Sequence, residues 1–261
     1  MTAARRGWIA GGVVAIGALV AFLAWPEKGK DTIYNEETVA IMQRVMTPDA
    51  NGVDVGAYEG TLTEPMTRAA PRGEHFAVEP LPEYAARLRT KFPRVHVLEM
   101  ALADTSGTSD FLAAVEDPTR SGLRTQEYPR AVEHLKHITV RVARMDEVIP
   151  DSLKIALIKI DVEGAEYAVL KGAAKTILRS RPVIVFEYGK AGVEHYGTTS
   201  EMMWSLLHDQ YGLELALMRT YLDGGPAYTK DEFQAMVKST ADWMFVAYPN
   251  ASAAGLGAGG R

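Results

Sequence analysis

The sequence predicts an α/β domain with an open, largely parallel sheet and a ligand site at the carboxyl ends of its strands. Three features support this prediction, in chain order: a glycine loop after an apolar segment at Val53, an acid that ends the next strand at Glu79, and an acid-rich turn after a central strand at Asp161. Sheets of this class bind their ligands just outside the carboxyl ends of the strands. The order of the three features is the one that a cofactor-binding sheet requires.

Length and composition limit the chain to one sizeable domain with extensions. The chain has 261 residues and 47% hydrophobic residues, which suffices for one large core and is short for two. Its net charge of -5 comes without a block of Lys or Arg, so a nucleic-acid partner is not expected. The absence of cysteine excludes disulfides, thiolate metal sites and a Cys nucleophile.

The first strand runs into a glycine loop with the sequence Val53-Asp-Val-Gly-Ala-Tyr-Glu-Gly-Thr61. Gly56 lets the backbone turn tightly beside a ligand, and Gly60 allows a close approach at the start of a helix, whose free N–H groups face the same cleft. The spacing G-x-x-x-G differs from the dinucleotide fingerprint G-x-G-x-x-G. The loop therefore argues against a nucleotide-dependent oxidoreductase.

The second strand is predicted at His75–Glu79, where Pro80 closes it, and a helix starts at Pro82. An acid about 20 residues beyond a glycine loop, at the end of the second strand, is placed to accept hydrogen bonds from both ribose hydroxyls of a cofactor. We interpret Glu79 as this acid. The alternative is an exposed strand-end glutamate without a ligand.

The central stretch runs from Ile155 to Gly172 and changes its periodicity in the middle. Its first part is a short apolar run rich in β-branched residues, typical of a strand buried on both faces. After Gly164 the apolar residues follow helical spacing. The turn between them holds Asp161, Glu163 and Glu166, whereas a purely structural turn needs one Asp or Asn and one Gly. Three acids favour a functional site.

Short apolar runs predict the remaining elements. Strands are expected at 95–98, 110–115, 138–142, 182–187, 213–218 and 243–248, and a short helix is expected at 230–238. Thr198 and Glu201 match a capping box that starts a helix through Met203.

Two loops carry further candidate residues. Arg120 and Arg124 lie in a polar loop, where they would clamp a carboxylate or phosphate of an acceptor, although solvated loop arginines are commoner. His195 follows Glu187 in the loop at which the sheet would present acceptor-side groups. His195 is a candidate general base, and the alternative is a solvated histidine.

The segment Gly7–Trp25 contains 19 residues without a charge. At about 1.5 Å per residue, a helix of this length just crosses a hydrocarbon core of roughly 30 Å. Trp8 and Trp25 stand at its ends, where interfacial aromatic residues belong. A cleaved signal peptide is the competing interpretation, but no small-x-small cleavage site precedes Pro26. A buried core helix is the third option, and the lack of a polar face argues against it.

The predicted organisation is a flank at 1–6, a transmembrane anchor at 7–25, a linker at 26–38, the globular domain at 39–250 and a flexible Ala/Gly-rich tail at 251–261. The basic residues on the two sides of the anchor balance, so the positive-inside rule does not orient it.

The string Ile158-Lys-Ile-Asp-Val-Glu-Gly-Ala-Glu166, followed by Val169-Leu-Lys-Gly172, resembles the central signature of the FkbM family of S-adenosylmethionine-dependent methyltransferases. The resemblance extends over about 51–249. It implies the Rossmann-like sheet of class I methyltransferases, with strand order 3-2-1-4-5-7-6 and the last strand antiparallel. The cofactor would lie over strands one and four.

The resemblance also implies roles for single residues. The methionine end of the cofactor would lie near Asp54, with the glycine loop passing around it. The family carries a Glu-Pro pair where this chain has Glu79 and Pro80. Asp104 becomes a candidate for the adenine amine. The family usually has Asn at the position of Tyr58. The cofactor-binding residues implied are Asp54, Gly56, Tyr58, Gly60, Glu79, Pro80, Asp104 and Asp161.

The activity implied is methyl transfer to a hydroxyl of a sugar, or of a glycosylated or lipid-linked metabolite. Asp161 is the first choice as base or acceptor-positioning group, followed by Glu187, Glu163 and His195. Tyr188 is a further candidate for contact with the acceptor. Asp161 and Glu187 would alternatively hold Mg²⁺, which lowers the pKa of a bound hydroxyl.

Two other classes of function compete with this one. The chain would otherwise be a membrane-tethered binding module that keeps the fold without catalysis, or an enzyme of another type on the same sheet. Because S-adenosylmethionine is a cytosolic cofactor, an active domain is expected on the cytoplasmic side of the membrane.

Overall fold

The computed structural model describes residues 29–114, 121–123, 135–189 and 196–250. The predicted anchor at 7–25 and the predicted tail at 251–261 lie outside these ranges, as do Arg120, Arg124 and His195. Within the described ranges, no helix has the length and apolar character needed to cross a membrane.

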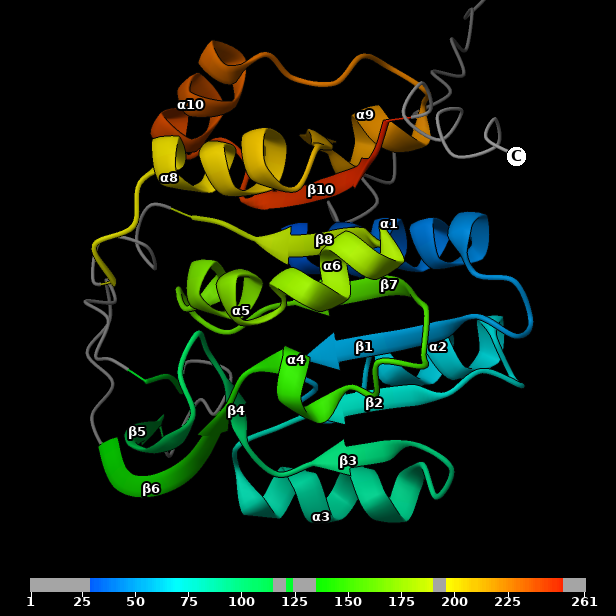
Figure 1. Cartoon of the computed structure of the whole chain (residues 1–261), viewed down its shortest axis with the longest axis vertical. Helices are drawn as coiled ribbons and strands as arrows, with labels where there is room; N and C mark the ends of the chain where they lie inside the picture. Colours follow the sequence, from blue (N-terminus) through cyan, green and yellow to red (C-terminus); the bar gives the residue numbers. More distant parts are fainter. Residues whose placement is uncertain (1–28, 115–120, 124–134, 190–195, 251–261) are drawn as a thin grey trace, which may run out of the picture.

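A seven-stranded sheet forms the centre of the molecule (Figure 1), with the order β3-β2-β1-β7-β8-β10-β9. Strand β10 is antiparallel to both of its neighbours, and the other pairings are parallel. This is the predicted order 3-2-1-4-5-7-6, and the prediction is confirmed. The strands are β1 Asn51–Val55, β2 His75–Val78, β3 His96–Leu98, β7 Ile155–Ile160, β8 Val183–Glu187, β9 Leu213–Leu217 and β10 Met244–Pro249.

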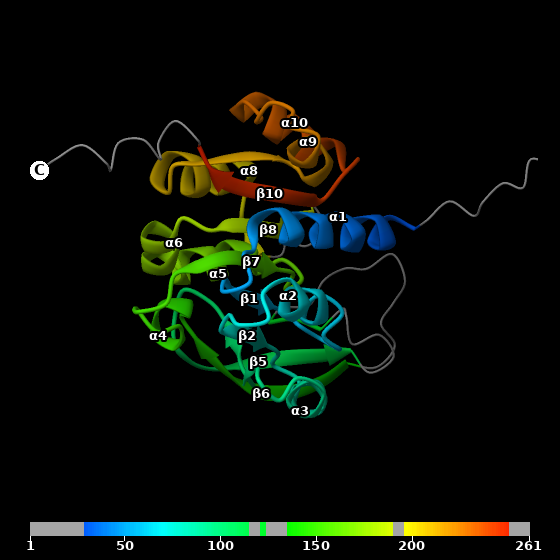
Figure 2. The ribbon, with the colours of Figure 1, turned by 90° about the vertical axis from the view of Figure 1, so that its right-hand side faces the viewer.

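Helices cover both faces of this sheet. Figure 2 views the layers edge on: α4 (Met145–Val148), α5 (Glu166–Gly172) and α6 (Ala174–Ser180) lie on one side, and α1 (Lys30–Val45) and α2 (Thr63–Ala69) lie on the other. Strand β8 shows why both layers are needed. Ile184 and Phe186 join the core under α5 and α6, whereas Val183 and Val185 join the core under α1. Apolar residues on both faces of a strand must be covered twice.

Helix α1 begins at Lys30, so the predicted linker at 26–38 is wrong from that residue onward. Tyr34 and Thr38 are buried, and Ile41 continues the same helix face. The exposed residues of the first turns are charged or polar, which made the segment resemble a linker; they are Lys30, Asp31, Thr32 and Glu36. The globular domain was predicted to start at residue 39, and α1 already begins at Lys30, nine residues earlier.

A second sheet of three strands, which the sequence did not predict as a separate unit, lies beside the first. Its order is β4-β6-β5, with β5 antiparallel and β4 parallel to β6. An isolated bridge between Leu112 and Gly122 brings residues 121–123 to its edge. The strands are β4 Ala101–Leu102, β5 Gly107–Ala114 and β6 Leu135–Ala143.

The helices predicted from Pro82, after Thr198 and at 230–238 are present, but one helix start differs, and α9 (Met218–Leu222) was not predicted. Thr199, not Thr198, caps α8, and Glu201 binds Lys230 at 2.6 Å instead of closing a capping box. A capping box is found instead at Thr229 and Glu232, at the start of α10. The remaining helices are α3 Pro82–Lys91, α8 Ser200–Trp204, the π-helix η2 Ser205–Gln210, α9 Met218–Leu222 and α10 Lys230–Ser239.

Candidate active site

A cavity of about 390 Å³ opens at the carboxyl ends of β1, β2, β7 and β8. This size falls within the range of small-molecule sites. The loops after β1, β2 and β7 and the last residue of β8 line it, together with the first turns of α1, the start of β10 and the segment at β4 and β5. The cavity therefore lies at the edge of the sheet where the sequence predicts the site.

Gly56 brings the loops after β1 and β7 into contact. Its φ is +75°, and a Cβ at this position would lie 1.9 Å from the carbonyl oxygen of Asp161. Glycine is required here for conformation and for space. Gly60 differs, because a Cβ there would meet Phe92 at 2.4 Å, and Gly60 does not line the cavity. Its predicted role in cofactor binding is corrected to packing against α3.

Tyr58 adopts a left-handed backbone conformation with φ of +48°. Its N–H donates to Oε2 of Glu79 at 2.9 Å, and its ring lies 4.4 Å from the ring of Tyr84. Asn is among the few residues that adopt this conformation readily, which gives a physical reason for Asn in the family. In this chain the backbone N–H makes the contact, and Tyr58 still lines the cavity.

Glu79 is buried at the cavity wall, with 4% of its surface exposed. Its second oxygen accepts a hydrogen bond from the N–H of Leu81 at 2.8 Å. Burial raises the pKa of Glu79 above its ordinary value, and the N–H groups of Leu81 and Tyr58 only partly offset this. The alternative of an exposed strand-end glutamate is therefore wrong. Glu79 and Pro80 both line the cavity.

Asp54 faces the same cavity and is 1% exposed. Its Oδ2 accepts a hydrogen bond from the Thr63 hydroxyl at 2.6 Å. Its Oδ1 pairs with the Nζ of Lys159 at 3.4 Å. Because this distance is longer than that of a charge-assisted hydrogen bond and a carboxylate oxygen accepts more than one donor, Oδ1 has room for a second cationic donor, such as the ammonium group of a methionine moiety.

Lys159 is the residue that the sequence interpretation missed. It lies within strand β7, is 4% exposed, and donates to the carbonyl oxygen of Gly56 at 2.8 Å. Its Nζ lies 3.4 Å from Asp54 and 3.6 Å from Asp161. Burial by itself would lower the pKa of Lys159, but the two carboxylates outweigh it and raise that pKa. A lysine inside an otherwise apolar strand was the available signal.

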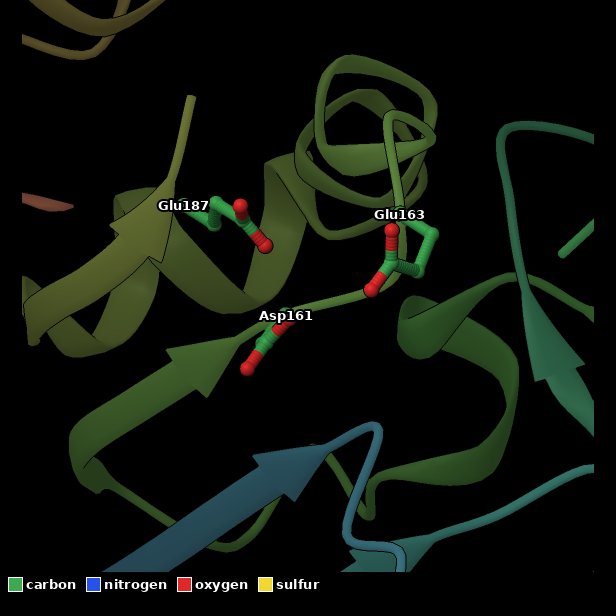
Figure 3. A group of neighbouring side chains, drawn as sticks. All are labelled: Asp161, Glu163 and Glu187. Carbon is green, nitrogen blue, oxygen red and sulfur yellow. The ribbon is translucent and has the colours of Figure 1, made fainter. Parts of the chain in front are cut away.

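Asp161, Glu163 and Glu187 form a carboxylate cluster (Figure 3), with ligand oxygens within 4.8 Å of one another. Strands β7 and β8 are adjacent and paired, so the residues after Ile160 and Phe186 meet. Burial, followed by the charges of Asp161 and Glu163, raises the pKa of Glu187 well above its ordinary value. The sequence predicted this neighbourhood of Asp161 and Glu187.

Glu166 does not join this carboxylate cluster. It is 1% exposed and accepts hydrogen bonds from the N–H groups of Val162 and Gly164, both at 3.1 Å. Burial raises its pKa to about 7. Glu166 therefore has a structural role in the turn. The third member of the carboxylate cluster is Glu187, from the neighbouring strand β8.

Two predicted ligand contacts are corrected. Asp104 pairs with Lys171 at 2.6 Å and does not line the cavity, which is bounded there by Met100, Ala101 and Leu102. Tyr188 is 1% exposed and packs in the core 6.2 Å from the ring of Phe233. An adenine contact of the Asp104 side chain and an acceptor contact of Tyr188 therefore have no support in the geometry.

The carboxylate cluster is also the place where a cation would bind. Carboxylate oxygens are the ligands that Mg²⁺ and Ca²⁺ prefer, and Mg²⁺ often uses one or two of them together with water. The donor set of Asp161, Glu163 and Glu187 fits a divalent cation chemically.

Comparisons with known proteins find methyltransferases. Residues 54–213, more than half of the chain, match the family described as the methyltransferase FkbM domain. The 2-O-methyltransferase NoeI of Sinorhizobium fredii (strain NBRC 101917 / NGR234) is 25% identical over an alignment of 162 residues, and the match covers 56% of this chain and 65% of NoeI. The chain thus spans less than two thirds of that relative.

The chain is also similar to solved structures of methyltransferases. The crystal structure of methyltransferase FkbM from Methylobacillus flagellatus KT has a TM-score of 0.47 and 15% identity, over 78% of this chain and 44% of that chain. The precorrin-6y C5,15-methyltransferase from Geobacter metallireducens GS-15 has a TM-score of 0.42 and 14% identity, over 69% and 72%. The matched range includes the glycine loop, Glu79 and the carboxylate cluster, and the chain belongs to the methyltransferase FkbM domain family.

Proposed function

We propose that this protein transfers a methyl group from S-adenosylmethionine to a hydroxyl oxygen of a sugar, or of a glycosylated or lipid-linked metabolite. The observation that carries the proposal is a single cavity lined by the buried carboxylates of Glu79 and Asp54 and by the carboxylate cluster. Family membership supports the reaction type, and the relative NoeI is named a 2-O-methyltransferase.

The lining divides into parts that suit different portions of the cofactor. Glu79 is held by two backbone N–H groups, so its oxygens are fixed in position to accept hydrogen bonds from ribose hydroxyls. Asp54 and the Gly56 loop suit the methionine portion, and the backbone of 100–102 bounds the space left for adenine. When bound, S-adenosylmethionine supplies a methyl group on a sulfonium that is already a good leaving group.

The protein must align the acceptor oxygen and remove its proton. Asp161 is the exposed member of the cluster, with 41% of its side chain exposed. The Nζ of Lys159 lies 3.6 Å from its Oδ2. Its partner Glu187 has a pKa well above its ordinary value through burial and neighbouring charge. A carboxylate with a raised pKa is a better proton acceptor near neutral pH than an ordinary one. Asp161 orients the hydroxyl, and Asp161 or Glu187 receives the proton.

The test is calorimetric titration of S-adenosylmethionine into the purified protein, with Glu79→Ala as the variant. The matched control is Glu83→Ala, which removes an exposed glutamate of α3 that is paired with Arg87. Micromolar binding that Glu79→Ala loses and Glu83→Ala keeps is the expected result. Absence of binding by the folded protein would contradict the proposal and favour a binding module that keeps the fold only.

Mg²⁺ at the carboxylate cluster is a variant of this mechanism. A divalent cation would lower the pKa of the acceptor hydroxyl and reduce the need for a protein base. Turnover that EDTA abolishes and Mg²⁺ restores would assign the cluster to a metal. Turnover that EDTA leaves unchanged would assign the carboxylates to base and positioning roles.

We also propose that the segment at 7–25 anchors the domain to a membrane, with the domain on the cytoplasmic side where the cofactor is made. Four residues at 26–29 separate this segment from Lys30, and an extended chain of that length reaches about 14 Å at most. The cavity would then face an acceptor close to the bilayer surface. Recovery of the full chain in the membrane fraction, with a C-terminal reporter active in the cytosol, is expected; a soluble chain would contradict the anchor.

A further inference from the structure

One end of the cavity is formed by residues that the proposed cofactor contacts do not use. Trp243 and Met244 of the β10 segment line this end. Met244 pairs with Glu187 across the sheet, and the carbonyl oxygen of Trp243 accepts a hydrogen bond from the N–H of Tyr188 at 2.7 Å. Trp243 therefore lies directly beside the strand end that carries Glu187.

Helix α1 fixes the indole ring of Trp243. The Nζ of Lys30 lies 4.4 Å from the ring centroid, and the ring of Tyr34 meets it edge to face at 5.2 Å. The Tyr34 hydroxyl donates to Asp242, and Lys30 donates to the carbonyl oxygen of Ala241. The ring is thus held at the cavity wall by a helix far from it in sequence, and a rigid aromatic surface loses little entropy on binding.

The charge of the lining is strongly one-sided. Among the described residues, the cavity is lined by six carboxylate side chains and by one amine, that of Lys159. The charge of Lys159 is already shared between Asp54 and Asp161. An anionic group placed near the carboxylate cluster would meet repulsion from like charges.

We propose that the Trp243 end of the cavity is the acceptor subsite, and that it selects an uncharged polyol ring over a phosphorylated or carboxylated one. This inference rests on the proposed function. Ionised carboxylates only accept hydrogen bonds, so the cluster suits hydroxyl groups that donate. The apolar C–H face of such a ring packs on the indole surface, as aromatic residues commonly do in sites with a few polar groups.

The experiment measures binding without turnover. Saturation-transfer NMR on the full chain in detergent, saturated with S-adenosylhomocysteine, compares a methyl hexoside with its 6-phosphate, the corresponding uronic acid and the corresponding 2-amino sugar. The neutral hexoside is expected to bind at least about tenfold more tightly than the two anionic analogues, a difference of about 1.4 kcal/mol. Trp243→Ala should lose the neutral ligand, and Trp243→Phe should retain most of its affinity.

A second variant tests the charge selection separately. Asp161→Asn combined with Glu163→Gln should reduce the ratio of the affinities for the neutral and the phosphorylated ligand by at least about threefold, since two like charges of the carboxylate cluster are removed. The matched control Glu83→Gln lies on α3, outside the cavity, and should leave the ratio unchanged.

The outcomes separate this inference from the proposed function. Calorimetric binding of S-adenosylmethionine together with equal affinity for neutral and anionic sugars would overturn the acceptor subsite and leave methyl transfer standing. The amino sugar is expected to bind at least as tightly as the neutral hexoside, because the lining is acidic. Much weaker binding of the amino sugar would overturn the charge argument. If the unmodified chain does not bind S-adenosylmethionine, the proposed function itself is overturned.

Discussion

Lys159 shows how a single buried charge organises the floor of the site. It connects the strand ends of β1 and β7 through Asp54, Asp161 and the carbonyl oxygen of Gly56. The ion pair between Lys159 and Asp54 is almost fully buried, since the two side chains are 5% and 1% exposed. Removal of the lysine would leave a buried carboxylate without its counter-charge.

Lys159→Met is therefore expected to lower the free energy of unfolding by about 3 kcal/mol, because breaking a buried ion pair strands the other charge. The control is Lys171→Met, which removes a lysine that is 45% exposed and paired with Asp104. An exposed pair contributes about 1 kcal/mol at most. Urea unfolding at pH 7 measures the free energy of unfolding of both variants. An equal decrease in the two variants would contradict the role assigned to Lys159.

Asp161→Asn is expected to abolish methyl transfer while affinity for S-adenosylmethionine stays within a few-fold. The amide keeps the shape of the side chain but loses the charge that orients the hydroxyl and accepts a proton. Asp151→Asn is the control, since Asp151 is 83% exposed and pairs with Arg179. Initial rates and calorimetry measure the two quantities, and unchanged turnover would remove Asp161 from the mechanism.

Gly56→Ala is expected to destabilise the fold by about 3 kcal/mol or more and to abolish cofactor binding. The new methyl group would have to displace the Asp161 carbonyl oxygen, 1.9 Å away, in addition to the strain of a positive φ. Gly224→Ala isolates the strain, because Gly224 has φ of +70° and nothing within 4 Å of a Cβ. That variant should lose about 1 kcal/mol. Similar melting temperatures for the two variants would contradict the steric argument.

At the scale of an element, the turn between β7 and α5 is closed by one of its own acids. Glu166 accepts the N–H groups of Val162 and Gly164 from its place at the start of α5. These bonds hold the backbone on which Asp161 and Glu163 are displayed. Glu163 itself has a positive φ of +57°, a conformation that needs support from its surroundings.

The raised pKa of Glu166 predicts a specific dependence of stability on pH. Burial raises this pKa from 4.5 to about 7, so the folded state binds the proton more tightly than the unfolded state. The resulting stability is fully present below about 4.5 and is lost as pH rises through about 7. The full loss amounts to roughly 3 kcal/mol.

Glu166→Gln should remove this dependence, since its amide oxygen still accepts a backbone N–H and cannot ionise. The free energy of unfolding of the variant, relative to the unmodified protein, is expected to rise by roughly 3 kcal/mol between pH 4.5 and pH 8. Glu64→Gln, at a side chain that is 47% exposed, serves as control. Parallel curves for Glu166→Gln and the unmodified protein would contradict a raised pKa at this site.

At the scale of the whole molecule, α1 joins the amino-terminal part of the chain to the last strands of the sheet. Arg44 donates to the carbonyl oxygens of Tyr221 and Leu222, and Glu37 pairs with Arg219 at 2.9 Å. Ile41 and Met42 join the core that Val185 and Val246 form on this face. The helix therefore covers the sheet and at the same time supplies one wall of the cavity.

A chain that starts at residue 39 is expected to be less stable than one that starts at residue 29 by about 3 kcal/mol or more. The shorter chain lacks the buried side chains of Tyr34, Glu37 and Thr38, so a core face is left open. Thermal and urea unfolding of the two chains measure the difference. Equal stability would restore the interpretation of 26–38 as a linker.

The sequence by itself determined the sheet, its strand order through the family signature, and the glycine loop, Glu79 and Asp161 at its carboxyl edge. These features are local: a run of β-branched residues, a glycine at a fixed distance or an acid at a strand end has the same consequence wherever the chain places it. Adjacent parallel strands then bring their ends together, so the meeting of Asp161 with Glu187 could also be predicted.

Only the tertiary structure decided which of these side chains turn toward the cavity. Glu166 and Tyr188 turn inward, Asp104 turns toward Lys171, and Lys159 supplies the charge between two strand ends. Each of these outcomes depends on a partner brought close by folding, as Phe233 is to Tyr188. The contact between Tyr34 and Trp243 at the cavity wall is the clearest example of a contact that the sequence did not predict. The two residues lie at opposite ends of the domain's sequence and share no local pattern. Contacts of this kind arise from packing, which sequence periodicity does not specify.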